Sequence, residues 1–591
     1  MVRLGRVIAW VALGLLAGCD EQTGVVDDGS VVHDALLPDG ERPDGPATAD
    51  LGDAMFPDAA LSDALLSDAP AGCIETLIPS QCQAGYDAPL EALATAYDRS
   101  FHVVSAAAWG VWADVSVSDP QNRAIIDGFL QGNGWDFQAA TGKALTSVVT
   151  QWHKTAGLYG GVGIAADAFR YGVLRDQGYP AAEVSRARQH LLAGLDALHL
   201  AQAITGTSGA IARGFIRTDM PTYVYPTTPL FDTSGGPLPA EKNNGTWRED
   251  NSGGLYPKHI WEDSCSRDQL IGWVAAMGAA WEVIATDPNV AASYRQTLQQ
   301  DAKELGLGLK VVRKSGYDLE LIDADGRTTY HGYLHESAFD RIYIPNPWVK
   351  NGVNAIMALG IVATLAYVSQ DQVVQDYLDQ QLIAKRKLHE VARDQLIVDL
   401  GPKNNYSGHN MAFMGAWLAA RYLQGAQALV DVRKALSTKL YDNPALATPQ
   451  PSGWKQSLFD LIYAAGAAGA TAHGPTTGAV DATALQNATD TLHQFPQPPF
   501  WDEQVVNCDA QELSQALCTA VDGKTVLVVN PITDRGDEPQ SLTPVPFKLR
   551  PPSNYDWRSN PFRLNGGGSG QSMLSGVDLR FAYWLGRWVR R

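Results

Sequence analysis

An alternation of two kinds of helical segment between residues 85 and 495 constrains the fold of this chain most strongly. Segments 354–368 and 458–472 are apolar on nearly every side, which predicts helices surrounded by other helices. Segments 291–312 and 373–396 carry Lys, Arg, Glu and Gln on one side and aliphatic residues on the other, as expected of an outer layer. Inner and outer helices in alternation predict a mainly α fold, an α/α toroid of about six helical hairpins.

Two local patterns add detail to this prediction. In segment 268–285, apolar residues recur every three or four positions and predict one buried stripe, which consists of Leu270, Val274, Met277, Trp281 and Ile284. In segment 317–331, polar and apolar residues alternate around Asp325-Gly326, which is typical of a β-hairpin. We expect short β-hairpins of this kind to be inserted at a rim of the helical body.

The start of the chain has the pattern of an export signal. Arg3 and Arg6 precede an apolar run over residues 7–16 that is too short to span a membrane permanently. The following Leu16-Ala17-Gly18-Cys19 resembles the lipobox of bacterial lipoproteins. The resemblance implies a signal peptide at 1–18 and acylation of Cys19, which would anchor the protein to a lipid bilayer of the bacterial cell envelope, outside the cytoplasm. An ordinary cleaved signal peptide is the alternative.

Residues 19–72 differ sharply in composition from the rest of the chain. They contain thirteen acidic residues and one basic residue, Arg42, with few aromatic residues, which predicts a disordered, extended tether. A calcium-binding repeat is the alternative, but no spacing matches an EF-hand loop. Residues 73–591 have no second linker and are expected to form one large domain, closed by the Pro-rich segment 496–591. The net charge of −19 makes nucleic acid an unsuitable partner.

The other five cysteines divide into two close pairs and one single residue. Cys73 and Cys82 flank a short loop at the start of the predicted domain, and Cys508 and Cys518 flank another near its end. Outside the cytoplasm both pairs are expected to form local disulfides. Cys265 is left over as a buried thiol, with a catalytic nucleophile as the alternative.

The predicted architecture, with its aromatic loops, resembles the α/α-toroid carbohydrate-active enzymes, a group that includes glycoside hydrolases, epimerases and polysaccharide lyases. The resemblance covers most of residues 85–495 and implies a poly- or oligosaccharide substrate, cleaved by hydrolysis or by elimination at a uronic acid. Because one fold supports many activities, the site must decide between them. No cofactor is predicted. The alternative is a non-catalytic surface lipoprotein that binds glycan or a partner in the cell envelope.

The loop 403–410 resembles the Asn-Asn-His segment of toroid alginate lyases. By this resemblance Asn405 would neutralise the uronate carboxylate, and Tyr406 stands where the family has the histidine that takes a proton. His409, one turn further on, could act as acid or base if it faces a cleft. The alternative is that Asn404, Ser407 and Asn410 cap the helix that follows.

The densest group of titratable residues contains His331, His335 and Glu336. Strand alternation places His331 and Tyr333 on one face, with His335 next along it, so these groups could transfer protons. A metal site is not predicted, because no spacing supplies a further ligand. Hydrogen-bonded residues at the rim are the alternative.

A glycosidase would need two carboxyl groups on either side of the scissile bond. The candidates are Asp263 and Asp268, with Asp219 as a third, and the alternative for each is an ion pair or a helix cap. An anionic sugar would suit the basic side chains of the loop-rich stretch 205–268, which are Arg213, Arg217, Arg248, Lys258 and Arg267. Indole rings near loop ends could stack on a sugar or could be core anchors, and these belong to Trp247, Trp261, Trp348 and Trp454.

Overall fold

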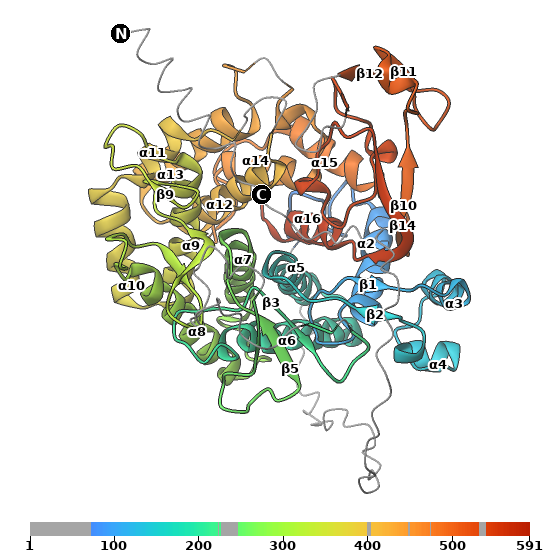
Figure 1. The fold of residues 1–591 in the computed structure, drawn as a ribbon, viewed down its shortest axis with the longest axis horizontal. Helices are drawn as coiled ribbons and strands as arrows, with labels where there is room; N and C mark the ends of the chain where they lie inside the picture. Colours follow the sequence, from blue (N-terminus) through green and yellow to red (C-terminus); the bar gives the residue numbers. More distant parts are fainter. Residues whose placement is uncertain are drawn as a thin grey trace, which may run out of the picture.

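The computed structural model describes residues 73–222, 224–225, 246–398, 404–446, 449–472, 474–530 and 539–591. The predicted signal peptide, lipidated Cys19 and tether lie outside the described residues. Helices dominate the described chain and small antiparallel sheets lie at its periphery, which confirms the mainly α prediction (Figure 1).

Six helices form the centre of the protein. They are α5 (Gly157–Asp176), α7 (Arg267–Ile284), α9 (Gly352–Ser369), α12 (Tyr406–Tyr422), α14 (Ser457–Ala467) and α16 (Val577–Trp588). Each contacts the next in this order, and α16 contacts α5 (Figure 1). They are buried along most of their lengths, as the apolar segments predicted.

A second set of helices packs on the outside of the first. It comprises α2 (Ala88–Ser100) on α16, α6 (Ala181–Ala203) on α5, α8 (Ala292–Lys310) on α9 and α7, α11 (Leu388–Gln395) on α9, α13 (Ala426–Ala435) on α12 and α15 (Ala482–Leu492) on α14. Short helices α3 (Pro120–Gln131) and α4 (Phe137–Thr141) lie near the N-terminal end of the described chain (Figure 1). The amphipathic segments predicted as outer helices lie in this second set.

The predicted continuous helix over 373–396 is wrong in one respect. The chain forms α10 (Gln372–Asp376), a π-helical segment η4 (Tyr377–Lys385) and then α11. Lys387, between the last two, has a left-handed φ of 54°, which no α-helix can accommodate. The amphipathic pattern predicted the buried face but could not reveal this break.

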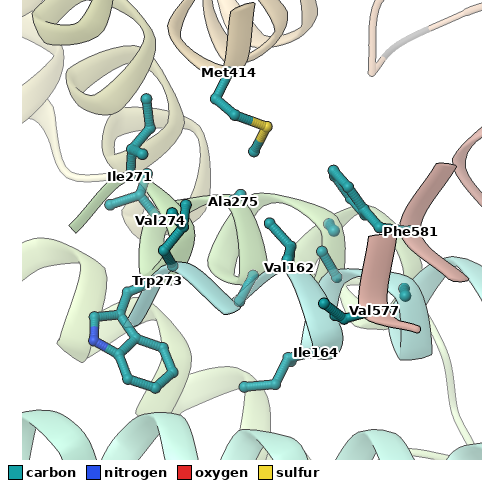
Figure 2. Close-up of a cluster of buried hydrophobic side chains, with 14 of the residues drawn as sticks. Val162, Ile164, Ile271, Trp273, Val274, Ala275, Met414, Val577 and Phe581 are labelled. Carbon is teal, nitrogen blue, oxygen red and sulfur yellow. The ribbon is translucent and has the colours of Figure 1, made fainter. Parts of the chain in front are cut away.

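The centre of the helical body is a tightly packed apolar layer. Figure 2 shows side chains from four helices meeting there, among them Val162 of α5, Ile271 and Val274 of α7, Met414 of α12 and Phe581 of α16. The predicted stripe of α7 is buried at all five positions, which confirms that part of the sequence analysis.

The helix α9 is, among the described residues, the one long and apolar enough to cross a membrane. However, 83% of its most apolar stretch is buried inside the protein. Burial against neighbouring helices explains its composition without a membrane.

Five small antiparallel sheets complete the described fold. The largest has the order β10-β14-β1-β2 and consists of β1 (Val115–Ser116), β2 (Gln151–Trp152), β10 (Phe500–Val506) and β14 (Asn565–Leu574). The strands β3 (Gly214–Arg217), β5 (His259–Glu262) and β4 (Trp247–Glu249) pair in that order. The predicted hairpin is present as β6 (Glu320–Ile322) paired with β7 (Thr328–Tyr333), and β8 (Ala338–Phe339) pairs with β9 (Ile342–Tyr343).

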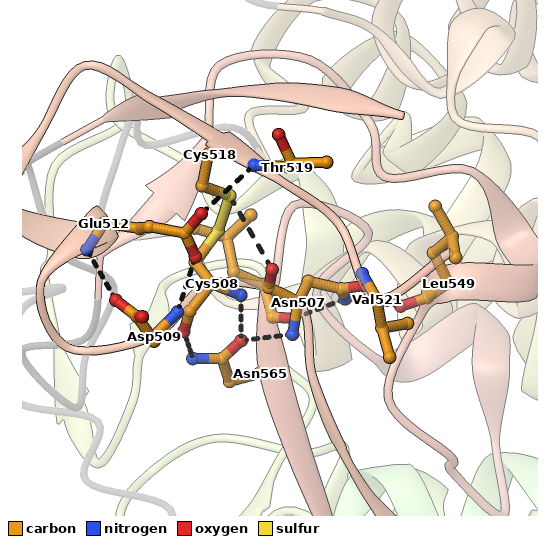
Figure 3. Close-up of a disulfide and its surroundings, with 10 residues drawn as sticks. Asn507, Cys508, Asp509, Glu512, Cys518, Thr519, Val521, Leu549 and Asn565 are labelled. Atoms are coloured by element: carbon orange, nitrogen blue, oxygen red, sulfur yellow. Dashed lines mark hydrogen bonds between the residues drawn. A yellow bond between two sulfur atoms is a disulfide. The ribbon is translucent and has the colours of Figure 1, made fainter. Parts of the chain in front are cut away.

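The C-terminal segment has a small hydrophobic core of its own. The strands β11 (Leu517–Thr519), β12 (Val526–Asn530) and β13 (Gln540–Ser541) cover this core, which includes the predicted disulfide Cys508–Cys518. Figure 3 shows the amide of Asn507 donating to Leu549 O at 2.7 Å beside this disulfide. The second predicted disulfide, Cys73–Cys82, is also present. Cys265 is a buried free thiol.

Candidate functional site

Polar side chains converge where central helices α5, α7 and α12 begin. Tyr159 lies in the first turn of α5, Asp268 in the first turn of α7 and Ser407 in that of α12. Arg558, from the C-terminal segment, donates from Nη1 to Tyr159 Oη at 3.0 Å and from Nε to Ser407 Oγ at 2.7 Å. One guanidinium therefore joins two helix starts that are far apart in the sequence.

Asp268 is a buried carboxylate held in its ionised form. It accepts hydrogen bonds from Ser266 Oγ and, at 3.1 Å, from Gln269 Nε2. Burial alone would raise the pKa of Asp268, but the charges of Arg213 and Arg558, together with the Ser266 hydrogen bond, lower it below its ordinary value. Arg213 is fixed nearby, since its Nη1 donates to Ser266 Oγ at 2.8 Å.

Asp114 has the opposite electrostatic character. It lies directly before β1, is partly exposed, and accepts a hydrogen bond from Asn554 Nδ2. Burial of its carboxyl raises the pKa of Asp114 to about 7; the Asn554 hydrogen bond opposes this rise and the charge of Asp502 adds to it. Near neutral pH, Asp114 therefore holds a proton in a large fraction of molecules while Asp268 is ionised.

The hydroxyl of Tyr159 lies in the electrostatic field of both carboxyl groups. Burial raises its pKa, the Arg558 guanidinium opposes that rise, and the charges of Asp114 and Asp268 both act on its hydroxyl. We call Asp114, Tyr159, Asp268 and Arg558 the Tyr159 cluster. The Tyr159 ring packs against Trp112 and Tyr555, with centroids 4.6 and 4.5 Å away, so its hydroxyl is held in one place.

The residues singled out at the start of α12 lie beside this cluster. Asn405 is the N-cap of the helix and accepts a hydrogen bond from Ser407 N at 3.0 Å, so its side chain takes the capping role. Tyr406 and His409 are buried, and their rings lie 5.5 and 4.8 Å from that of Trp454. The Nδ1 atom of His409 lies 3.5 Å from Asn404 Nδ2.

The structure separates the two histidines of the predicted titratable group. His331 Nδ1 lies 3.7 Å from Asp340 Oδ1. His335 lies 3.3 Å from the carboxylate of Glu336, which itself pairs with Arg386. Burial and the Arg386 charge lower the pKa of His335 to about 4, so it is neutral at physiological pH. His335 and Glu336 thus belong to a buried ion network, as the rim alternative predicted.

Most of the other predicted acidic and basic residues pair with each other. Asp263 accepts a hydrogen bond from Arg248 at 2.6 Å, and burial raises the pKa of Asp263 to about 6. Arg217 pairs with Asp219 at 2.9 Å, and Lys258 reaches the same carboxylate at 3.2 Å. Arg267 donates to Asn354 Oδ1 at 3.1 Å. These pairs favour the ion-pair alternative, and Arg213 is the predicted arginine that reaches Asp268 through Ser266.

The tryptophans predicted to stack on sugar differ greatly in exposure. Trp247, Trp261 and Trp454 are buried, and the indole N–H of Trp261 donates to Glu249 O at 2.9 Å. Their burial favours the core-anchor alternative, because these indole rings pack inside the protein. Trp348, in the loop before α9, is 84% exposed and could stack on one.

Sequence reasoning missed three members of the cluster. Asp114, Tyr159 and Arg558 have no motif around them, and Arg558 lies 399 positions beyond Tyr159, so no spacing could have connected them. In the sequence, only the aromatic residues of the loops near the helix starts could have indicated a site there.

Two other features bear on possible ligands. Within the described ranges, no group of three His, Cys, Asp or Glu side chains could hold a metal ion. A cavity of about 280 Å³ lies between α6 and α8 and contains Asp196, His199, Tyr294 and Asp301, but no member of the Tyr159 cluster.

Comparison with known proteins gives no relative: no protein family model matches the chain, and no curated protein is significantly similar to it.

Proposed function

We propose that this protein is a carbohydrate-active enzyme that hydrolyses glycosidic bonds, with Asp114 as the general acid and Asp268 as its ionised partner. One observation carries the proposal: two carboxyl groups that act on the same tyrosine have pKa values displaced in opposite directions. Glycosidases need one protonated and one ionised carboxyl group at the same pH.

The proposed roles follow from the chemistry of each group. Asp114 would donate its proton to the leaving oxygen, and Asp268 would activate a water molecule or stabilise the positive charge that develops on the sugar ring. Tyr159 and Arg558, which hydrogen-bond each other, would orient the sugar hydroxyls. The exposed ring of Trp348 would supply a stacking surface.

The overall architecture that we propose is an α/α toroid within a single domain over residues 73–591. Support comes from the order of contacts among the six central helices, which returns from α16 to α5, and from the outer helix packed on each of them. The pairing of β14 with β1 ties the C-terminal segment 496–591 to the start of the domain.

The proposed location is the cell envelope, with a lipid anchor at Cys19. The two disulfides support an oxidising compartment, because such bonds are rare in the cytoplasm.

Elimination at a uronic acid is a second candidate, favoured by the hydrogen bond between Arg558 and Tyr159. In that case the arginine would neutralise the uronate carboxylate, and the tyrosine would move the proton. Asn405, Tyr406 and His409 would then line the same region. A non-catalytic glycan-binding lipoprotein is the third possibility.

A panel of neutral and uronate glycans, incubated with the full chain, separates these three functions. Reducing ends without ultraviolet absorbance indicate hydrolysis, whereas both signals together indicate elimination. Silence across the panel, with binding detected by calorimetry, indicates a binding protein and overturns the enzyme proposal.

For hydrolysis, we expect Asp114→Asn and Asp268→Asn each to lower kcat by at least about 100-fold, because each removes one of the two carboxyl functions. Asp379→Asn, at an exposed carboxylate of η4, is the matched control and should keep full activity. Full activity of either cluster variant would contradict the assignment.

A further inference from the structure

We propose that Asn554 is a positioning residue that fixes the carboxyl of Asp114 and determines which of its oxygens carries the proton. This inference rests on the proposed role of Asp114 as general acid.

Both ends of the Asn554 side-chain amide are engaged. Nδ2 donates to Asp114 Oδ1, and Oδ1 accepts a hydrogen bond from Ser575 N at 2.9 Å. A rotation of the amide by half a turn would set oxygen against oxygen and N–H against N–H. The orientation shown is therefore strongly preferred over its reverse.

Paired strands fix the positions of Asp114 and Ser575, the two hydrogen-bond partners of the Asn554 amide. In the pairing of β1 with β14, Val115 lies opposite Met573, so Asp114 and Ser575 lie at the same end of this pair of strands. On the other side, His153 N donates to the backbone oxygen of Asp114 at 2.8 Å. Asn554 thus links a catalytic candidate from the start of the domain to a rigid strand from its end.

The hydrogen bond also distinguishes the two carboxyl oxygens of Asp114. Oδ1 accepts from an N–H group and cannot easily carry the acid proton as well. The proton of the neutral acid is therefore assigned to Oδ2, the oxygen left to face a substrate. Without Asn554 the carboxyl could rotate and present the wrong oxygen.

The charges that act around Asp114 are few. The carboxylate of Asp502 acts on it from β10, and Tyr159 of α5 interacts with it electrostatically. Arg558 reaches this region through Tyr159, and the His153 ring hydrogen-bonds Ser116 Oγ at 2.8 Å. Asn554 is the side chain that opposes the rise in the pKa of Asp114.

The test uses Asn554→Asp, which keeps the side-chain shape but replaces the donor with an acceptor, and Asn554→Ala, which removes both hydrogen bonds. We expect kcat to fall about 10- to 100-fold in each with KM nearly unchanged, as is typical when the partner of a functional group is lost. The alkaline limb of the pH–rate profile should move upward, because a bond that lowers the pKa of Asp114 is lost. Thermal unfolding of each variant checks that it folds.

A second readout does not depend on activity. The carbon-13 carboxyl signal of Asp114, assigned as the resonance that disappears in Asp114→Asn, should titrate at higher pH in Asn554→Ala than in the wild type. An unmoved titration overturns the positioning role, even if Asp114→Asn abolishes activity. Conversely, a wild type inactive on every glycan, together with a shifted titration, overturns the proposed function and leaves the positioning contact intact.

Discussion

At the scale of single residues, the opposite shifts of Asp114 and Asp268 predict the pH dependence of activity. The rate of hydrolysis should fall above about pH 7, where Asp114 loses the proton it must donate. On the acid side, the lowered pKa of Asp268 favours its ionised form, so the loss of activity there should follow the unfolding of the protein and not the titration of Asp268. A pH profile of kcat/KM checks both limbs, and Asp379→Asn should reproduce it. A profile that is flat from pH 5 to 9 would contradict the assignment.

Glu282 of α7 and Arg421 of α12 form a buried ion pair that has a structural role only. Glu282 accepts hydrogen bonds from Arg421, from Tyr422 at 2.8 Å and from Trp588 at 2.8 Å, and the side chains of the ion pair are only 2% and 5% exposed. Arg421→Met should lower the free energy of unfolding by about 3–5 kcal/mol, because it leaves a buried carboxylate without its cation.

The double variant Arg421→Met with Glu282→Gln removes both charges and should recover more than half of that loss. Denaturant unfolding measures both variants. An equal loss in the single and double variants would mean that packing, not charge, stabilises this contact.

At the scale of elements, α5 and α7 approach each other where both carry glycine. A Cβ built on Gly161 would lie 2.0 Å from Gly272 O, so no side chain fits between the two backbones. Gly161→Ala should therefore destabilise the protein by at least about 3 kcal/mol, since the helices must separate. Gly128→Ala, in exposed α3 with nothing within 4 Å, should instead stabilise it by about 0.5 kcal/mol. Thermal unfolding compares the two, and similar effects would contradict this close crossing.

Helices and strands were predictable from the sequence where the spacing of apolar residues alone determines the secondary structure. The segment predicted at 268–285 became α7 at 267–284, and the alternation around Asp325 became the hairpin of β6 and β7. The π-helical break at η4 was not predictable, because the same polar and apolar pattern fits a continuous helix. A polar cap at the start of α12 was expected, but from Asn404, Ser407 and Asn410; the structure gives the N-cap to Asn405, whose side chain accepts a hydrogen bond from Ser407 N.

At the scale of the whole molecule, a buried network joins the first and last helices of the described chain. Arg580 of α16 donates to Asp98 of α2 at 2.7 Å, and His102 contacts Asp167 of α5 at 2.8 Å. The ring of His102 stacks on that of His190, with centroids 3.6 Å apart. Burial lowers the pKa of both histidines far below 6.5, so they are neutral in the folded protein.

This arrangement predicts acid sensitivity of folding. Below pH 6.5 the unfolded chain binds protons at these histidines and the folded chain does not, so each histidine should reduce stability by about 1.4 kcal/mol per pH unit. Unfolding measured at several pH values should show a shallower loss for His190→Gln than for the wild type.

His199→Gln is a control for which we expect the opposite effect of pH on stability, because Asp301 raises the pKa of His199. The stability that this pair adds is present below pH 6.5 and is lost as pH rises through the pKa of the folded state. Between the folded-state pKa of His199 and pH 6.5, acidification should therefore add stability to the wild type but not to the His199 variant, and below pH 6.5 the two slopes should be parallel. A His190 variant that follows the wild-type slope would contradict the linkage.

The candidate site could be predicted from the sequence only in part. Asp268 was a candidate because it opens a helix in a loop-rich region, but Asp114 and Asn554 are 440 positions apart and no local pattern connects them. Trp261 and Trp454 were candidates for stacking on a sugar because they lie near loop ends. Both are buried, because residues beside loops can still be covered by segments from elsewhere in the chain.

The contact between Asp114 and Asn554 also has a consequence for biogenesis. Synthesis begins at the N-terminus, so Asp114, Tyr159 and Asp268 are present in the growing chain long before Asn554 and Arg558. The proposed acid therefore has no fixed orientation until the C-terminal end of the chain has been made. A chain that ends before Asn554 is expected to leave the carboxyl of Asp114 without this hydrogen-bond partner.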